Sequence, residues 1–237
     1  MLALDLFCGG GGACIGMQQA GFEVVGIDNK VHKNYPGHFI QADALHPPVS
    51  LADFDLVWAS PPCQKFSTAN SMWKEKKASY PDLIPDVREL LKGHAYTVIE
   101  NVPQAPIRPD LILYGENVGL GSTDNWDGLW RKRIFELSFF VWQLPKPKMK
   151  KGTYLSIAGR MGSSCHFYRR KEEGKPGSLT TMHAKAVMGI PLCQKMTCKE
   201  VANAVPPPYA RYIAEEVIRQ IKNERKSNYG KRDIRIT

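Results

Sequence analysis

The stretch Leu2–Gly21, LALDLFCGGGGACIGMQQAG, decides the fold. Leu2–Phe7 predicts a short apolar strand, Cys8–Gly16 a glycine-rich turn, and Met17–Gly21 a helix that ends on a glycine cap. A strand, a glycine turn and a helix in this order open the nucleotide-binding half of a Rossmann-like α/β fold, because glycine lets a ligand approach the backbone closely. The pattern alone does not separate a nicotinamide dinucleotide from S-adenosylmethionine.

Acidic residues follow the next two predicted strands. Phe22–Ile27 is an apolar run that predicts the second strand, with Asp28 at its tip. An acid that lies about 20 residues beyond a glycine turn can hold both hydroxyls of a ribose. Phe39–Asp43 predicts a third strand. Asp43 at its end either accepts a hydrogen bond from an adenine amino group or is an ordinary turn or helix-cap aspartate.

A cysteine stands on a rigid turn at Ser60–Gln64, SPPCQ, directly after the predicted buried strand Phe54–Ala59. Its two prolines stop strand pairing and stiffen the exit. The carboxyl ends of parallel strands are where open α/β sheets bind ligands. A lone cysteine is more often a small buried hydrophobe, but the glycine turn and the two stretches described next favour a nucleophile. A nucleophilic Cys63 is expected in a locally positive site that lowers the pKa of its thiol.

Two charged stretches are expected near this cysteine. Ala95–Ile99 predicts the fifth strand with Glu100 at its tip, and the sheet order should bring that tip beside Cys63. The alternative for Glu100 is a solvated acid at a strand end. Trp130–Phe140 predicts a strand or hairpin arm in which the two arginines, Arg131 and Arg133, share one face by the two-residue period. The alternative for these two arginines is that they lie on an ordinary solvated face of the strand.

Composition limits the class of protein. The chain has 237 residues, 43% of them hydrophobic, which fits one α/β domain with a full core. Its net charge of +9 suits a polyanionic partner, although a merely soluble basic protein has the same charge. No apolar run is long enough for a membrane span, and Met1–Asp5 lacks the charged start of a signal peptide. Irregularly spaced cysteines are typical of a reducing compartment, so a cytoplasmic location is expected.

Two polar regions are predicted to contact a large ligand. Lys65–Tyr80 has no clear period and predicts a long loop, which beside a nucleophile is expected to act as a lid. In Lys146–Lys185 basic side chains far outnumber acidic ones and aromatic side chains are interspersed, a mixture that suits phosphates and bases. The spacing of Cys165, His166, Cys193 and Cys198 matches no standard zinc site, so no metal is expected.

The C-terminal part predicts two helices. Thr197–Glu200 fits a capping box that starts a short helix, which Val205–Pro208 interrupts. Tyr209–Arg225 carries apolar side chains at four-residue steps and predicts an amphipathic helix. Lys226–Thr237 is basic, has no periodic apolar face, and is expected to be loose.

Together these stretches resemble the cytosine-5 DNA methyltransferases, and in compact size the phage-encoded kind. The similarity runs from Asp5 to about Ala214 and is weakest in the middle. Six stretches match the family's motifs in the family's order. Asp5–Gly12 matches the cofactor motif, Pro61–Gln64 the catalytic cysteine motif and Glu100–Val102 the acid motif. Arg131–Arg133 matches the arginine pair, Leu179–Pro191 the ninth motif and Asn203–Pro207 the last motif.

The chain departs from the family pattern at two motifs. Leu129 stands two places before the first arginine of the pair, where glutamine is usual, which puts one polar contact in doubt. Met182 and His183 replace the usual arginine and glutamate of the ninth motif, which is therefore a degraded version.

The resemblance implies a Rossmann-like, S-adenosylmethionine-dependent methyltransferase fold with a small basic target-recognition lobe. It implies that Cys63 bonds to carbon 6 of a flipped-out cytosine while Glu100 engages the ring nitrogen and exocyclic amine. Arg133 is expected to hold the ring carbonyl oxygen, and Arg131, which completes the expected catalytic set, to support the loop or a phosphate.

The resemblance also implies S-adenosylmethionine as cofactor and double-stranded DNA as partner, with no metal, no membrane and a monomeric protein. The residues expected to bind the cofactor are Phe7, Gly9, Gly11, Asp28, Asp43, Pro61 and Asn203. Those expected to contact nucleic acid are Gln64, Lys65, Ser67, Arg169 and Arg170.

The expected organisation is a catalytic and cofactor-binding part over residues 1–145, a target-recognition lobe over 146–178, and a return to the catalytic part over 179–225. So short a lobe predicts a short recognition site of about two to four base pairs. An RNA methyltransferase of the tRNA type shares most of these motifs, and a non-catalytic DNA-binding protein with this fold is a further alternative. A nicotinamide oxidoreductase would explain the glycine turn but leave Cys63, Glu100 and Arg133 without roles.

Overall fold

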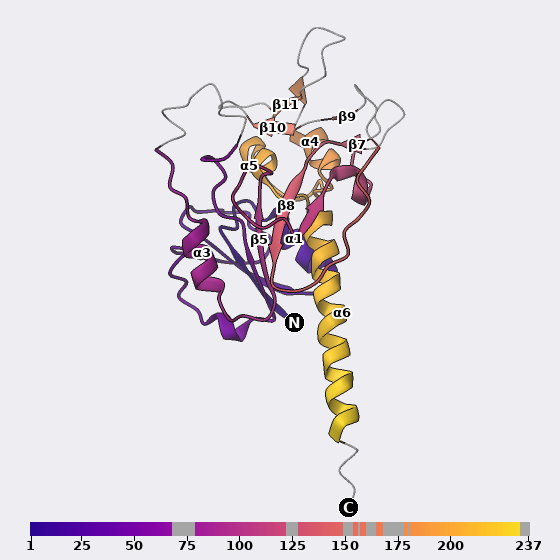
Figure 1. Cartoon of the computed structure of the whole chain (residues 1–237). Coiled ribbons are helices and arrows are strands. Elements are labelled where there is room, and N and C mark those ends of the chain that lie inside the picture. The colour runs from indigo at the N-terminus through magenta and orange to yellow at the C-terminus, as the bar shows by residue number, and fades with distance from the viewer. Residues whose placement is uncertain are drawn as a thin grey trace, which may run out of the picture.

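The computed structural model describes residues 1–67, 79–121, 128–148, 154–155, 157–159, 165–167, 178–179 and 181–232. Most of the predicted lid and of the predicted target-recognition lobe therefore lies outside the described residues. Within the described part, helices cover both faces of a central sheet, which confirms the predicted α/β class (Figure 1).

The central sheet has seven strands in the order β3-β2-β1-β4-β5-β8-β6. Neighbouring strands from β3 to β5 pair in parallel, whereas β8 runs antiparallel to both β5 and β6. The carboxyl ends of the parallel strands and the amino end of β8 consequently meet at one edge of the sheet. The strands are β1 (Leu2–Leu6), β2 (Glu23–Asp28), β3 (His38–Gln41), β4 (Leu56–Ala59), β5 (Thr97–Asn101), β6 (Leu111–Leu113) and β8 (Arg133–Leu137).

Two apolar cores lie on the two faces of this sheet. One contains α1 (Gly12–Ala20) and α6 (Pro207–Arg232), and the other contains α3 (Ile84–Leu91). Helices α1 and α6 approach so closely that a side chain at Gly16 would overlap the backbone oxygen of Pro207. Glycine at this position therefore permits the packing of the C-terminal helix on the first helix.

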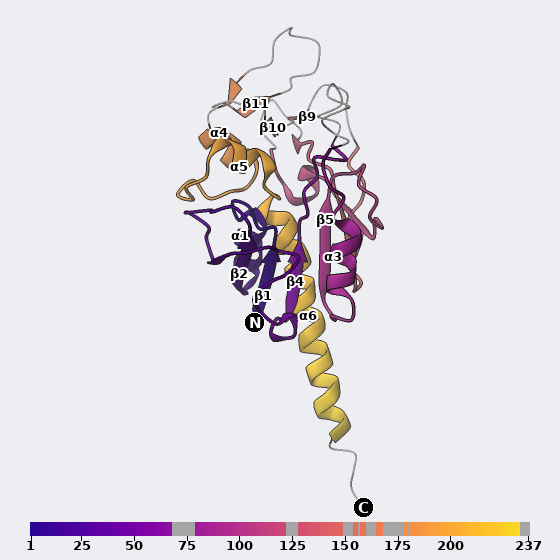
Figure 2. The same cartoon turned by 90° about the vertical axis from the view of Figure 1, so that its left-hand side faces the viewer.

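Most of the remaining elements lie at the edge of the sheet where the parallel strands end, whereas η1 (Leu51–Asp53) directly precedes the start of β4. Helices α4 (Thr181–Val187) and α5 (Cys198–Asn203) lie at that edge together with β10 and β11, whereas the far end of α6 extends beyond the opposite end of the sheet (Figure 2). No helix of the described part is long and apolar enough to cross a membrane. The short elements are η1 (Leu51–Asp53), η3 (Gly115–Val118), β7 (Gly128–Leu129), β9 (Tyr154–Leu155), β10 (Ile157–Gly159), β11 (Cys165–Phe167) and β12 (Ser178–Leu179).

Several predicted boundaries shift. Helix α1 begins at Gly12 rather than at the predicted Met17, because left-handed residues complete the turn early. Helix α6 begins at Pro207, in line with the preference of proline for the first turn of a helix, and continues to Arg232. The segment from Lys226 to Arg232, predicted as a loose tail, is therefore helical.

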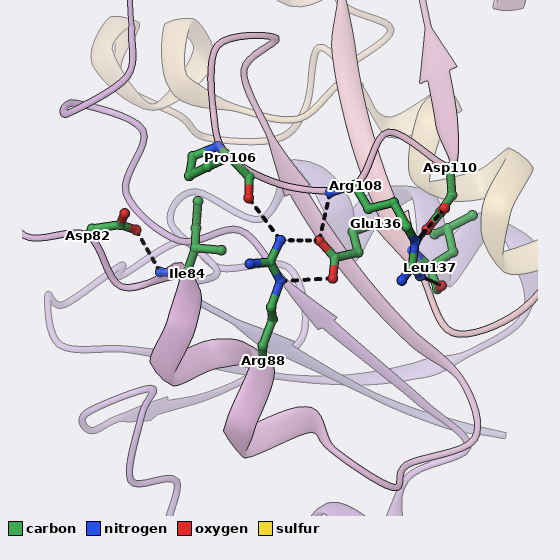
Figure 3. A network of polar contacts seen from close by, with 8 residues as sticks. All are labelled: Asp82, Ile84, Arg88, Pro106, Arg108, Asp110, Glu136 and Leu137. Carbon is green, nitrogen blue, oxygen red and sulfur yellow. Dashed lines mark hydrogen bonds and ion pairs between the residues drawn. The ribbon is translucent and has the colours of Figure 1, made fainter.

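A polar network fixes helix α3 to the antiparallel strand β8 (Figure 3). The Arg88 guanidinium donates from Nε and Nη2 to the two carboxylate oxygens of Glu136, at 2.9 and 2.7 Å, and also from Nη2 to the Pro106 carbonyl. Arg108 donates its backbone N–H to the same carboxylate and its side chain to Asp110. Strand β8, which carries Arg133 at its start, is therefore held from the α3 side as well as by its sheet neighbours.

Candidate active site

Cys63, Glu100 and Arg133 meet at the edge where β4 and β5 end and β8 begins. The register pairs Ala59 with Ile99, so the turn after β4 lies beside Glu100. Strand β8 pairs Glu100 with Phe135 and brings Arg133 alongside, with its Nε 2.8 Å from Glu100 Oε1. The structure thus brings together three residues that are far apart in the sequence, and for Cys63 and Glu100 this is the placement that the sheet order predicted.

The turn that carries Cys63 is held by its neighbours. The Asn101 side-chain amide donates to the Pro61 carbonyl at 3.0 Å, in a buried contact. The Cys63 carbonyl accepts from the backbone N–H groups of Phe66 and Ser67 at 3.0 and 2.9 Å. These contacts fix the backbone on both sides of Cys63, whose side chain remains partly exposed.

Glu100 is a buried acid and not the solvated strand end that was its alternative. It is 6% exposed, and its burial raises the pKa of its carboxyl despite the opposing effects of Arg133 and Arg131 and a hydrogen bond with Ser60. The Ser60 hydroxyl in turn accepts from the Trp58 indole N–H at 2.9 Å. Sequence reasoning assigned no role to Ser60, although its place directly before the proline turn was a usable signal.

The Cys63 thiol does not have the lowered pKa that was predicted. Burial raises its pKa, and the Glu100 carboxylate acts in the same direction. The positive charges of Arg133 and Arg131 lower it, but desolvation of the thiolate outweighs them. Burial of the site therefore favours the neutral thiol.

Arg131 makes its side-chain hydrogen bonds with the scaffold, and its place in the predicted catalytic set stays a prediction. It precedes β8, so the two-residue period does not place it on one face with Arg133. Its guanidinium is buried and donates to the carbonyls of Ile157, Ala202 and Ala204 at 2.9, 2.6 and 2.8 Å. Burial and the nearby Arg133 charge lower its pKa to about 9. Arg131 thus ties the start of β8 to β10 and to the connection between α5 and α6.

The glycine turn has the backbone geometry of a ligand cradle. Phe7 has a φ of 58°, a left-handed conformation that is uncommon outside glycine and clusters at functional sites. Gly9 and Gly11, with φ of 51° and 87°, complete the turn. The Gly9 N–H donates to Asp28 Oδ2 at 3.1 Å, so the acid at the tip of β2 lies directly beside the turn. This is where the sequence placed a ribose-binding acid.

The other residues predicted to bind the cofactor differ in their surroundings. Pro61 is buried in the proline turn, and Asn203 is exposed at the end of α5. Asp43 lies beyond the end of β3, where its carboxylate accepts from the Leu45 N–H at 3.0 Å and contacts His46 at 2.8 Å. The His46 contact lowers the pKa of Asp43. These contacts are those of the turn aspartate that was the alternative for Asp43.

The residues predicted to contact nucleic acid are only partly described. Gln64 is exposed, and Lys65 and Ser67 are partly buried beside the Cys63 turn. Arg169 and Arg170 lie outside the described residues. Among the residues that the structure describes, no three His, Cys, Asp or Glu side chains are grouped as metal ligands would be.

Asp5 is a buried acid beneath the glycine turn to which sequence reasoning gave no separate role. It is 1% exposed, Oδ2 accepts from the Tyr35 hydroxyl at 3.0 Å, and Oδ1 has no hydrogen-bond partner. Burial raises its pKa to about 7, with further contributions from the Asp28 and Glu100 charges. The sign in the sequence that the Asp5 side chain is buried was its position inside an apolar predicted strand.

We expect the Asp5 carboxyl to make the free energy of unfolding depend on pH. Its folded pKa of about 7 lies above the unfolded value, so the folded state binds more protons and stability is lost as the pH rises from about 4 to about 7. The loss is up to about 4 kcal/mol. Asp5→Asn removes this titration. Urea unfolding of both proteins across the pH range should show the wild type losing stability relative to the variant, and parallel curves would contradict the assignment.

Comparison with known proteins places these observations in a family. A family model described as C-5 cytosine-specific DNA methylase matches residues 1–106. The Type II methyltransferase M.HgiGI of Herpetosiphon aurantiacus is 30% identical over 119 residues, which make up 44% of this chain and 93% of that relative. The Type II methyltransferase M.HgiDI of the same organism is also 30% identical over 119 residues, but the match spans only 38% of its length.

A solved structure supports the fold. A mutant of Spodoptera frugiperda DNMT2 superimposes with a TM-score of 0.60 at 12% sequence identity, over 92% of this chain and 99% of that one. At this identity the likeness concerns the fold alone.

Proposed function

Because this chain belongs to the C-5 cytosine-specific DNA methylase family, we propose that it transfers a methyl group from S-adenosylmethionine to carbon 5 of cytosine in DNA through a covalent bond to Cys63. The observation that carries the proposal is the position of the Cys63 thiol at the same sheet edge as the buried Glu100–Arg133 ion pair. A nucleophile, an acid and a cation that meet at the ligand-binding edge of an α/β sheet fit this chemistry.

The nucleophile solves a specific chemical problem. Carbon 5 of cytosine is a poor nucleophile, and addition of the Cys63 thiolate to carbon 6 makes it enamine-like. Carbon 5 then accepts the methyl group, a base removes the carbon 5 proton, and the electron pair of that C–H bond restores the ring double bond as the sulfur leaves. The resting thiol is neutral, so its proton must depart before or during attack, and the positive charges of Arg133 and Arg131 favour the thiolate that results.

Glu100 and Arg133 are the groups that hold the cytosine ring in this proposal. A carboxyl whose pKa is raised by burial can keep a proton to share with the ring nitrogen N3, while its other oxygen accepts from the exocyclic amine. The hydrogen bonds that run from Trp58 through Ser60 orient this carboxyl. Arg133 lies against Glu100 and is suited to the ring carbonyl oxygen.

The glycine turn fits the adenosyl group of the cofactor. The left-handed Phe7, Gly9 and Gly11 form a turn that a ligand can approach closely, and the Asp28 carboxylate beside it suits the ribose hydroxyls. S-adenosylmethionine, when bound, supplies an electrophilic methyl group on a sulfonium. The Asp43 carboxylate is engaged in its own turn, so a contact with adenine would have to use its remaining lone pairs.

The proposed substrate is double-stranded DNA with the target cytosine flipped out of the helix. A base inside the stack cannot reach Cys63, and flipping costs a few kcal/mol. The net charge of +9 favours the phosphate backbone. We assign closure over the base to the loop Lys65–Tyr80 and the choice of a short site to the lobe over residues 146–178.

The direct test is incubation of unmethylated duplex DNA and of tRNA, side by side, with S-adenosylmethionine, followed by base-resolution mapping of 5-methylcytosine. We expect methylation of duplex DNA at a site of about two to four base pairs. Methylation of tRNA alone would assign the protein to the RNA-modifying alternative. Absence of methylation together with tight DNA binding would favour the non-catalytic alternative.

Replacement of Glu100 tests the role of the acid. We expect Glu100→Gln to lower kcat by about 10²-fold, because a side-chain amide has no acidic proton to transfer to N3 as charge develops on the ring. Glu89→Gln, on the exposed surface of α3, is the matched control and should leave kcat unchanged. Unfolding curves must accompany the rates, because the change leaves Arg133 without its carboxylate. A Glu100→Gln protein that is folded and fully active would contradict the assignment.

A further inference from the structure

His32 lies between two carboxylates that belong to different parts of the chain. Its Nδ1 is 2.9 Å from Glu200 Oε1, and its Nε2 is 3.7 Å from Asp28 Oδ2. The side chain is 14% exposed, and its ring meets Phe39 edge-on at a centroid distance of 6.1 Å. A histidine that is enclosed and aimed at two acids in this way has a defined orientation.

The two carboxylates are themselves anchored beside the glycine turn. Asp28 accepts from the Gly9 N–H at 3.1 Å and from the Lys30 N–H at 2.9 Å. Glu200 accepts from the backbone N–H and hydroxyl of Thr197 at 2.7 and 2.8 Å, in the capping box that starts α5. The side chain of Glu200 also lies so close to Gly10 that a Cβ on that glycine would overlap it.

The segment around His32 forms a second contact with the same C-terminal region. Pro36 lies against Gly11 so closely that an added Cβ would overlap its ring. The Gln194 side chain donates to the Asn34 carbonyl at 2.5 Å. The residues after β2 therefore meet the segment that leads into and begins α5 through two side-chain contacts, Gln194–Asn34 and His32–Glu200, and the second of these lies beside Asp28.

We propose that His32 is a positioning residue for the cofactor, which couples the ribose-binding acid Asp28 to the C-terminal segment through Glu200. The inference rests on the proposed function, since it assumes that the glycine turn and Asp28 receive S-adenosylmethionine. The backbone N–H groups of Gly9 and Lys30, together with His32, restrict the Asp28 carboxylate. The lone pairs of this carboxylate that remain therefore face in a fixed direction. His32 itself does not need to touch the cofactor.

The experiment is titration of the full chain with S-adenosylhomocysteine and with its 2′-deoxyribose counterpart, followed by calorimetry. We expect His32→Ala to weaken S-adenosylhomocysteine binding about tenfold, because it removes the side chain that lies 3.7 Å from the Asp28 carboxylate and is itself held by Glu200. In the wild type, removal of the 2′-hydroxyl should cost affinity, and in His32→Ala it should cost much less, because Asp28 is no longer oriented. A merely structural defect would weaken both ligands equally and leave the ratio of their affinities unchanged.

Two further proteins complete the test. His38→Ala is the matched control, since His38 is exposed at the start of β3, and it should bind both ligands as the wild type does. A double substitution of His32 and Glu200 should be no weaker than Glu200→Ala alone if the two residues act through one contact.

The outcomes separate the inference from the function on which it rests. A wild-type protein that binds neither ligand would overturn the proposed cofactor. A wild-type protein that binds both, with an unchanged affinity ratio in His32→Ala, would overturn only the role of His32.

Discussion

Cys63→Ser is expected to reduce DNA methylation by at least about 10³-fold, the scale on which loss of a covalent nucleophile acts. A serine hydroxyl at this position has no neighbouring base among the described contacts, and it is a far weaker nucleophile than a thiolate at neutral pH. The variant should fold normally, because the turn is held by backbone contacts and by Asn101. Methyl transfer from labelled S-adenosylmethionine to DNA measures the loss.

Trapping of the covalent intermediate gives this prediction a second readout. When S-adenosylmethionine is present and the methyl group has been transferred, 5-fluorocytosine at the target has no carbon 5 proton to lose, so the sulfur cannot leave and the protein stays attached to the DNA. We expect the adduct with the wild type and none with Cys63→Ser. Cys193→Ser is the matched control, because Cys193 is a free and exposed thiol, and it should form the adduct normally. An adduct on any residue other than Cys63 would disprove the mechanism.

Arg131→Ala is expected to lower the free energy of unfolding by about 3–5 kcal/mol, the usual cost of breaking a buried charged network. The substitution leaves the carbonyls of Ile157, Ala202 and Ala204 without their donor in the interior. It also removes the residue that joins β8 to the C-terminal segment. Urea unfolding followed by tryptophan fluorescence measures the change.

A conservative variant separates this scaffold role from a catalytic one. Arg131→Lys keeps the positive charge near Cys63 but cannot reach all of the carbonyls, so stability should fall while the rate per folded molecule stays close to that of the wild type. Arg108→Ala is the matched control, because Arg108 also donates to a backbone carbonyl but is 63% exposed, and water can replace it. A stable Arg131→Lys protein with a large loss in kcat would show that Arg131 acts in catalysis after all.

The contrast between Arg131 and Arg133 shows where sequence reasoning reached its limit. The two arginines stand two residues apart, and strand periodicity predicted one shared face. The strand begins only at Arg133, so Arg131 turns into the interior while Arg133 meets Glu100. No local pattern contains this difference, because the partners of Arg131 lie in β10 and after α5.

The direction of the Cys63 pKa is a second case. The sequence predicted nearby positive charge, and Arg133 and Arg131 supply it. The cost of burying a thiolate exceeds their effect, and the degree of burial is known only once the chain has folded. Asp43 is a third case, since its contacts with Leu45 and His46 are known only from the structure, and its contact with adenine stays a prediction.

The sequence by itself determined the elements whose signals are local. These are the strand and glycine turn that open the chain, the proline turn with Cys63, the acid at the end of β5 and the capping box of α5. Each depends on residues within a few positions of one another, through backbone conformation and short-range hydrogen bonds.

The tertiary structure alone decided the long-range features. The antiparallel course of β8 brings Arg133 to Glu100, burial sets the pKa of Cys63, Glu100 and Asp5, and His32 joins Asp28 to Glu200. These properties depend on desolvation and on partners that are distant in the chain, and both arise only when the sheet and its two cores assemble.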